Sequence, residues 1–326
     1  MVCYFHKFDV QVKGKWFNRQ LIEVMSNNFV MKTLSYYKEA IDLGVITVNH
    51  KIVDPTYILR NGDSIQHTVH YHEPESIKIP ILAIENDFIV VNKPSGIACH
   101  PTGGYNLFSV TRILEKHGNL SCINRLDVVT SGILILAFKN AEKYHSQMIK
   151  GKIVKKYLAK VKGNFPSEIT VNHKLEKNKH NTSFVSENGK ECVTIFKLLK
   201  YQKGYSLIEC QPITGRSHQI RVHLLSIGFP ITNDPVYNEN PECFYKADKI
   251  EQKDEKAWPC LQPIEEKDQI EAFILRNCRQ SETRAFKNIN AFICLHAYQY
   301  KFENKIYTAD PPDWAKEFDL ESFLEF

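Results

Sequence analysis

The sequence predicts an α+β protein with a small N-terminal domain, followed by a larger domain built on a mixed or antiparallel sheet. With 326 residues, the chain is longer than most single domains. Its composition, 43% hydrophobic and 24% charged, is typical of a globular protein. In the larger domain, strand patterns dominate and do not alternate regularly with helical ones, which argues against a βαβ fold.

The N-terminal domain is predicted to contain two helices followed by short strands. Apolar residues recur at helical spacing over 16–30 and 33–43, and Gly44 ends the second helix. The stretch VITVNHKIV alternates on both sides of an Asn-His pair, which predicts a hairpin. Residues 57–74 predict two further strands around an Asn-Gly-Asp turn.

Residues 72–80 carry two prolines and three charged residues and are predicted to be a linker. We therefore place the domains at 1–73 and 74–326. The second domain is predicted to contain a hairpin around Glu85-Asn86-Asp87, helices over 106–117 and 140–151, and strands over 133–138, 156–163, 192–200, 205–211 and 292–302. Residues 238–290 show alternating charges without a clear period, which predicts a surface insertion.

Composition also excludes several classes of protein. No apolar run approaches the roughly 18 residues needed to cross a bilayer, and the first residues resemble neither a signal nor a transit peptide. We expect a cytoplasmic or nuclear protein that does not bind membranes. The nine cysteines are scattered without a C-x-x-C pair, which argues against disulfides and structural zinc, so we expect no metal. The net charge of +5 permits a polyanionic partner.

The stretch NRLDVVTSGILILA, residues 124–137, places a polar cluster directly before an apolar run. An ionised Asp that leaves water unpaired costs several kcal/mol. Asp127 must therefore be paired, solvated or used in chemistry. A turn or capping role near Thr130 is the structural alternative.

Four stretches together carry a resemblance to a known family: NKPSGIACHP (92–101), NRLDVVTSGILILA (124–137), KKYLAKVKG (155–163) and GRSHQIRVHLLSIGFPITNDPVY (215–237). Their sequence and order resemble the RluA-type pseudouridine synthases over roughly 80–236 and 292–314. The phrase KEAIDLGVITVNHKIVDPTYILRNGD resembles an S4 RNA-binding domain. The N-terminal half also looks like the eukaryotic members that modify transfer RNA.

The chemistry that this resemblance implies can be compared with the residues. Conversion of uridine to pseudouridine breaks the N1–C1′ bond, rotates the uracil and rejoins it through C5, so no cofactor is required. Asp127 suits the nucleophile, because a carboxylate can form and release a covalent adduct. Arg221 is the candidate cation beside it, as the resemblance implies. Tyr157 offers a stacking platform and a phenol that hydrogen-bonds or takes the C5 proton.

Further residues are expected to contact the RNA, because the target base must be flipped out of its stack. By resemblance, Arg125 enters the vacated space. Thr130, Arg216, His218 and Gln219 are further candidates. The lysine-rich run 150–162, followed by Lys174, Lys177, Lys179 and His180, is interpreted as a phosphate-binding face. The family commonly has His where this chain has Asn124, which predicts a shift in RNA contacts.

These observations predict a monomeric RNA pseudouridine synthase that acts on a uridine in structured RNA. Transfer RNA is favoured by resemblance, in the anticodon loop near position 32. Ribosomal RNA is the alternative substrate. A catalytically silent S4-type RNA-binding protein is the alternative function.

Overall fold

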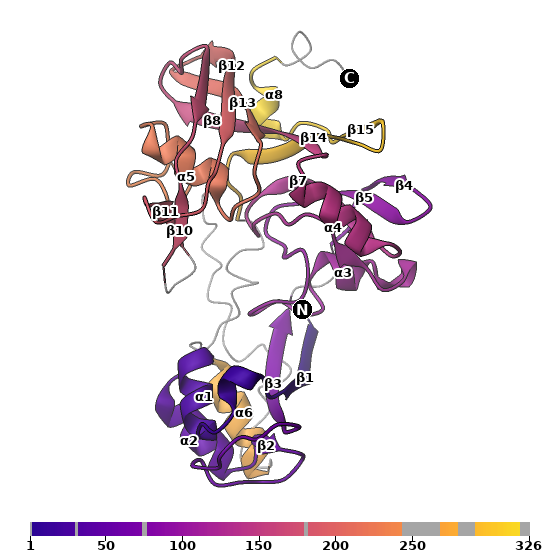
Figure 1. Ribbon diagram of the computed structural model, residues 1–326, viewed down its shortest axis with the longest axis vertical. Coiled ribbons are helices and arrows are strands. Elements are labelled where there is room, and N and C mark those ends of the chain that lie inside the picture. Colours follow the sequence, from indigo (N-terminus) through magenta and orange to yellow (C-terminus); the bar gives the residue numbers. More distant parts are fainter. Residues whose placement is uncertain are drawn as a thin grey trace. The chain divides into compact units, whose positions relative to one another are not determined.

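The computed structural model forms two compact units (Figure 1). The first comprises Met1–Pro74 and Lys249–Arg284, and the second comprises Glu75–Asp248 and Ala285–Phe326. The structure describes residues 2–29, 32–73, 77–178, 182–242, 268–279 and 291–319.

The first unit combines helices with a three-stranded antiparallel sheet of order β1-β3-β2. Its strands are β1 (Val2–Gln11), β2 (Ile46–Val48) and β3 (Ser64–Glu73). Its helices are η1 (Gly14–Trp16), α1 (Leu21–Asn28), α2 (Leu34–Asp42) and α6 (Gln269–Arg279). The two predicted N-terminal helices are present, although α1 begins five residues later than the start of the predicted helix at 16.

The predicted hairpin in this unit is only partly correct. Asn49 and His50 have positive φ of 50° and 63°, and Val48 and Lys51 bond across this tight turn. Beyond Lys51, however, the chain leaves the sheet, and β2 pairs with β3 instead. Sequence patterning also missed β1, because its mostly exposed side chains show no apolar alternation.

Helix α6 lies within the stretch that was predicted to be a surface insertion, yet it contributes to the core of the first unit. Phe273 and Ile274 are 1% and 5% exposed and belong to the same hydrophobic cluster as Leu21 and Ile41. The segment QIEAFILRNC is amphipathic, so the helix buries its apolar face against the N-terminal elements. This part of the insertion is therefore structural.

The second unit is built around a ten-stranded sheet of order β4-β5-β7-β14-β8-β13-β12-β9, with β15 on β14 and β6 on β7. The bounds of these strands are β4 (Ile81–Ile84), β5 (Phe88–Lys93), β6 (Ser121–Cys122), β7 (Ser131–Ala137), β8 (Val154–Lys162), β9 (Glu168–Val171), β12 (Thr194–Gln202), β13 (Tyr205–Pro212), β14 (Leu295–Phe302) and β15 (Lys305–Thr308). A separate pair joins β10 (Leu175–Lys177) to β11 (Ser183–Val185).

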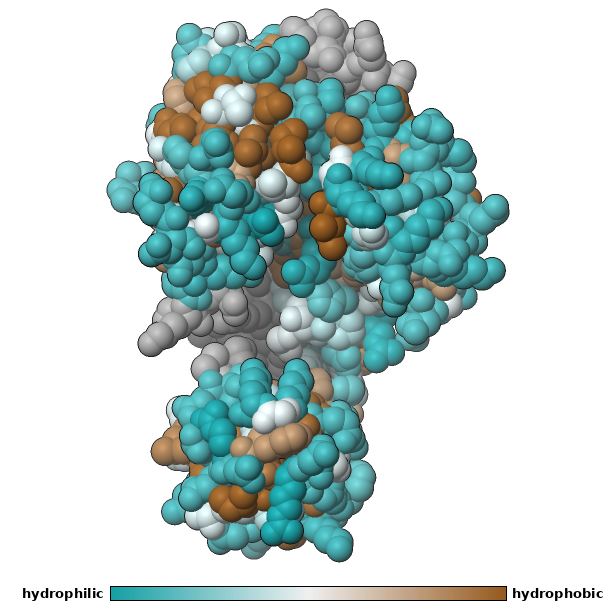
Figure 2. Space-filling model, viewed as in Figure 1, coloured by the Kyte–Doolittle hydropathy of each residue, from teal (hydrophilic) through white to brown (hydrophobic). Residues whose placement is uncertain are grey.

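This sheet is mixed, as predicted, because β7 and β14 run parallel while its other pairings are antiparallel. The helices of the unit are α3 (Val110–Ile113), η2 (Glu115–His117), α4 (Ala141–Ile149), α5 (Gln219–Ser226) and α8 (Asp313–Lys316). Among the described residues, no helix is long and apolar enough to cross a bilayer. Figure 2 shows hydrophilic residues over most of the visible face, with smaller hydrophobic areas.

Gly132 is required where β7 and β14 approach each other in parallel. Its φ is +111°, and a Cβ at this position would overlap the backbone carbonyl of Ala297. Gly132→Ala is therefore expected to lower the free energy of unfolding by at least about 3 kcal/mol, through backbone strain and the clash with β14. Urea denaturation measures this loss.

Gly204 is the matched control, because its φ is +83° but no atom lies within 4 Å of the position that a Cβ would take. Gly204→Ala is expected to cost only about 1 kcal/mol, from backbone strain alone. Equal losses in the two variants would show that the close approach of β14 is not what requires Gly132.

Candidate active site

Asp127 lies in the connection between β6 and β7, at the point where the polar cluster meets the buried strand. Its backbone carbonyl accepts a hydrogen bond from Thr130 N at 3.1 Å, which closes the turn. Its side chain does not cap this turn. Instead, Oδ2 accepts from Arg221 Nη1 at 2.8 Å, which is the short distance of a charge-assisted pair.

Arg221 is presented to Asp127 by a second carboxylate. Its Nε and Nη2 donate to the two oxygens of Asp234 at 2.6 and 2.7 Å. Asp234 is fully buried and also accepts from the backbone N–H groups of Val236 and Tyr237. Because this clamp uses Nε and Nη2, the remaining Nη1 points at Asp127. The Tyr237 ring lies 4.8 Å from the guanidinium carbon and packs against the cation.

The electrostatics keep Arg221 charged. Burial alone would lower the pKa of this guanidinium, but hydrogen bonding to Asp234 and the charges of Asp127 and Asp234 outweigh burial and raise the pKa. In this group of three, one guanidinium therefore bonds to two carboxyl groups. Asp234 is buried and its hydrogen-bond partners all lie within the protein, whereas Asp127 is the carboxylate that reaches the surface.

Asp127 is accessible, whereas its partner is not. Its side chain is 30% exposed, and that of Arg221 is 4% exposed. His218, at the start of α5, places Nε2 3.7 Å from Asp127 Oδ1 and is itself partly exposed. Burial lowers the pKa of His218, so its imidazole is neutral at pH 7. Arg221 is therefore the positively charged partner of Asp127. His218 Nδ1 lies 2.7 Å from the Tyr237 hydroxyl.

Tyr157 lies on β8 and is 8% exposed. Its hydroxyl is 2.6 Å from that of Tyr300 on β14, and Asn124 Nδ2 donates to the Tyr300 hydroxyl at 3.2 Å. Burial raises the pKa of Tyr157, and the charge of Asp127 raises it further, so the two residues are close enough to interact electrostatically. The phenol is therefore protonated at neutral pH.

Asn124 does not face outward, contrary to the expectation that it would alter RNA contacts. It is 9% exposed, its Oδ1 accepts from Ile135 N at 2.8 Å, and its Nδ2 also donates to Ile133 O at 3.1 Å. The amide ties the turn to β7 and orients Tyr300, so its effect on the site is indirect.

Lys93 supports the Asp127 turn from inside the protein. Its side chain is fully buried, and Nζ donates to the carbonyls of Pro94, Ile97 and Val128 at 2.9, 2.9 and 3.2 Å. Burial lowers its pKa to about 8, while the charges of Cys99 and Asp127 act in the opposite direction. Because Val128 follows Asp127 directly, this ammonium fixes the backbone beside the carboxylate.

The predicted RNA-contact residues divide into two groups. Arg125 and Arg216 are exposed, as a substrate contact requires. Gln219 is 4% exposed and uses both ends of its amide within the protein, so its substrate role stays a prediction that these internal contacts do not favour. Its partners are Arg216 N, Thr214 Oγ1, Val193 O and Thr194 Oγ1. Thr130 is 2% exposed, and its side chain likewise faces inward.

The lysines of the run 150–162, predicted to form a phosphate-binding face, are partly engaged in ion pairs. Three lysines of β8 pair with glutamates: Lys156 with Glu209 at 3.1 Å, Lys160 with Glu317 at 3.2 Å, and Lys162 with Glu242 at 3.2 Å. Lys155 is 8% exposed, on the same side of the strand as Tyr157. Lys150 and Lys152 remain exposed, while Lys179 and His180 lie outside the described residues. Most of the strand's positive charge is thus neutralised locally.

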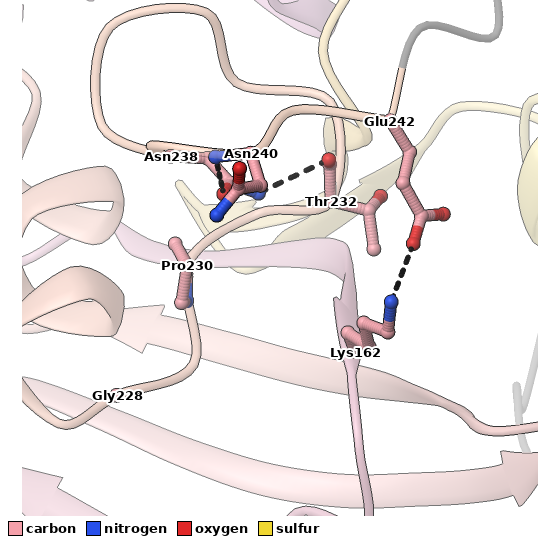
Figure 3. Close-up of a pocket in the computed structure, with 7 residues that line it drawn as sticks. All are labelled: Lys162, Gly228, Pro230, Thr232, Asn238, Asn240 and Glu242. Carbon is pink, nitrogen blue, oxygen red and sulfur yellow. Dashed lines mark hydrogen bonds and ion pairs between the residues drawn. The ribbon is translucent and has the colours of Figure 1, made fainter.

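A surface pocket of about 340 Å³ lies beside the end of β8 (Figure 3). Its lining residues are Lys162, Gly228, Pro230, Thr232, Asn238, Asn240 and Glu242. None of them is Asp127, Arg221 or Asp234, and Figure 3 shows the Lys162–Glu242 ion pair on the right side of the pocket. We therefore assign the chemistry to the Asp127 group rather than to this pocket.

Sequence reasoning did not single out Asp234, Tyr237, Tyr300 or Lys93. The first two stand in the NDPVY segment that ends the stretch 215–237, and a second carboxylate close behind Arg221 was the available signal. The role of Tyr300 depends on contacts with Tyr157 and Asn124, which are distant in sequence. Lys93 lies in the quoted stretch 92–101, but nothing in that stretch marked its side chain as buried.

The fold and this site agree with the family comparison. The model of the RNA pseudouridylate synthase family matches residues 87–226. Over 338 aligned residues, the chain is 31% identical to RNA pseudouridine synthase 7 of Arabidopsis thaliana, an alignment that covers 96% of this chain and 85% of that protein. The chain therefore belongs to the RNA pseudouridylate synthase family.

Other relatives match at higher identity over shorter stretches. Pseudouridylate synthase RPUSD2 of Mus musculus is 39% identical over 251 residues, covering 72% of this chain and 44% of that protein. The mitochondrial tRNA pseudouridine(32) synthase of Saccharomyces cerevisiae is 37% identical over 243 residues, covering 70% and 52%. The chain thus spans about half the length of these two relatives.

Proposed function

We propose that this protein is an RNA pseudouridine synthase that isomerises a uridine in structured RNA. The observation that carries the proposal is the Asp127–Arg221 pair, in which an accessible carboxylate is held by a buried cation. A nucleophile must be ionised and reachable, and its counter-charge must stay in place when substrate displaces water. Membership of the RNA pseudouridylate synthase family supports the same assignment.

In the proposed reaction, a carboxylate oxygen of Asp127 bonds to ribose C1′ as the N1–C1′ bond breaks. The uracil rotates against Tyr157, and its C5 then displaces the carboxylate from C1′. C5 loses its proton and N1, freed from C1′, takes up a proton, so the product contains the same atoms as uridine. Since burial keeps the Tyr157 phenol protonated, we assign it hydrogen bonding to the loose base rather than proton abstraction.

Tyr157→Leu is expected to weaken binding of the substrate RNA by about 5–150-fold, which corresponds to the loss of about 1–3 kcal/mol of base stacking. Tyr157→Phe keeps the ring and is expected to bind RNA within a few-fold of wild type. Filter binding on both variants measures the difference. Equal weakening in both would show that the hydroxyl, and not the ring, holds the base.

We propose that the substrate is transfer RNA and that the target lies in the anticodon loop near position 32. A 37% identical relative is named a tRNA pseudouridine(32) synthase, and a second, 32% identical, is named a tRNA pseudouridine(31) synthase. Mapping pseudouridine in total RNA from cells with and without the gene tests this choice. Loss of a site in ribosomal RNA alone would overturn it in favour of the alternative substrate.

We also propose that residues 1–73 form an S4-like RNA-binding domain. Support comes from its helix pair α1 and α2, its three-stranded sheet and its exposed cations, among them Lys13 and Lys15. Lys13→Ala/Lys15→Ala is expected to weaken RNA binding and to reduce the slope of log K against log salt by up to about 2, because each lost phosphate contact removes about 0.7–0.9. Lys116→Ala, at an exposed lysine of the second unit, is the control. An unchanged salt slope would contradict an RNA-binding role for these lysines.

The rival function is a catalytically silent RNA-binding protein. The arrangement of Asp127, Arg221 and Asp234 favours an enzyme. RNA binding alone does not require an accessible carboxylate that is paired with a buried Arg–Asp ion pair. One chain holds the whole group, so we propose that a monomer is active.

A further inference from the structure

Three metal-ligating side chains converge within the first unit. His70 and His72 lie two residues apart on β3 and therefore project from the same face of the strand, and Cys278 lies on α6. His70 Nδ1 is 2.9 Å from His72 Nε2 and 3.4 Å from Cys278 Sγ. The donor atoms all lie within 4.8 Å of one another, and the three residues are 8%, 6% and 6% exposed.

The spacing of these atoms suits a tetrahedral zinc ion. With Zn–N of about 2.0–2.1 Å and Zn–S of about 2.3 Å, two ligand nitrogens are about 3.3 Å apart, and a nitrogen and a sulfur about 3.6 Å apart. The observed 2.9 and 3.4 Å differ from these by a few tenths of an ångström. Small side-chain shifts therefore open the group enough to admit the ion.

The chemistry of the donors also fits. An imidazole offers a ring nitrogen to the metal, and the His72 ring is buried with Nε2 facing His70 Nδ1. The other ring nitrogen of His72, Nδ1, lies 3.8 Å from Cys3 Sγ. A ligating histidine is commonly oriented by a partner on its second nitrogen, and Cys3 occupies that place. Two imidazoles and one thiolate form a ligand set that zinc accepts.

We propose that His70, His72 and Cys278 bind a Zn²⁺ ion that fastens α6 to β3. On binding, Cys278 Sγ releases its proton to the solvent and coordinates as the thiolate, with no change of oxidation state. Cys278 is 208 positions from His70 in sequence, so the ion would close a long loop and stabilise the first unit. The missing C-x-x-C pair does not exclude such a site, because the H-x-H spacing in a strand supplies two ligands on one face.

The test uses the full chain, purified without a metal-binding tag and dialysed against Zn²⁺ and then against metal-free buffer. Elemental analysis is expected to find about one zinc per chain in wild type. The Cys278→Ser and His72→Gln variants are expected to contain at least tenfold less zinc per chain than wild type. Cys122→Ser, at a partly buried cysteine, and His50→Gln, at an exposed histidine, are the matched controls and are expected to keep it.

A second measurement covers the case in which the variants fail to fold. Wild-type apoprotein loaded with Co²⁺ is expected to show a sulfur-to-cobalt charge-transfer band and a raised melting temperature. Wild type that holds no zinc and gains no stability with it would overturn the proposal, as would zinc held equally by folded Cys278→Ser. The readouts do not depend on catalysis, and the Asp127→Asn variant is expected to bind zinc like wild type.

Discussion

Replacing Asp127 with Asn is expected to lower kcat/KM for pseudouridine formation by at least about 10⁴-fold, which corresponds to about 5.5 kcal/mol of transition-state stabilisation. The amide keeps the volume of the carboxylate and can still accept from Arg221 Nη1 through its oxygen. It carries no charge, however, and cannot form the adduct with C1′. The loss is therefore chemical, and the fold should be preserved.

Chromatography of nucleosides from digested RNA measures this effect, because pseudouridine and uridine separate although their masses are equal. Asp313→Asn is the control, since the Asp313 side chain is 98% exposed and lies outside the site. Activity of Asp127→Asn within tenfold of wild type would remove Asp127 from the role of nucleophile.

Replacing Arg221 with Met is expected to affect both stability and activity. Asp234 is fully buried and would lose the two charge-assisted bonds at 2.6 and 2.7 Å. An uncompensated buried charge of this kind costs about 3–5 kcal/mol of unfolding free energy. Activity should fall as well, because Asp127 loses its fixed positive partner.

The double variant Arg221→Met/Asp234→Asn separates the two effects. Neutralising Asp234 removes the unpaired charge, while the amide oxygen can still accept from Val236 N and Tyr237 N. Stability is expected to recover by at least half of the loss, whereas activity is not. Urea denaturation and kcat/KM measure the two quantities. If Arg221→Met were as stable as wild type, Asp234 would not depend on this pair.

The parts of the fold that local pattern determines were predictable from the sequence. Helices α1, α2 and α4 follow apolar periodicity, and β7, β8 and β13 follow apolar or alternating runs. Helix α5 was not predicted. Its residues QIRVHLLS are buried on nearly all sides, and Arg221 and His223 are both buried, so no amphipathic pattern marks the helix.

The pairing of residues within the quoted motifs was predictable from the sequence. Contacts between strands that are distant in sequence were not. The sequence predicted the Asp127–Arg221 pair, which the structure contains at 2.8 Å. The sequence could not indicate that the Gln219 amide hydrogen-bonds inside the protein. Its partners Val193 and Thr194 lie immediately before and at the start of β12, far from Gln219 in sequence. The sequence also could not indicate that α6 joins the first unit, because Phe273 meets the N-terminal helices only after folding.

The most direct test of the central claim is release of tritium from RNA labelled at uridine C5, measured in a single turnover of wild type and Asp127→Asn. Replacing N1 by C5 at C1′ expels the C5 hydrogen, so wild type is expected to release one tritium for each pseudouridine formed, and Asp127→Asn essentially none. Release by both proteins at similar rates, or by neither, would contradict a reaction carried by Asp127.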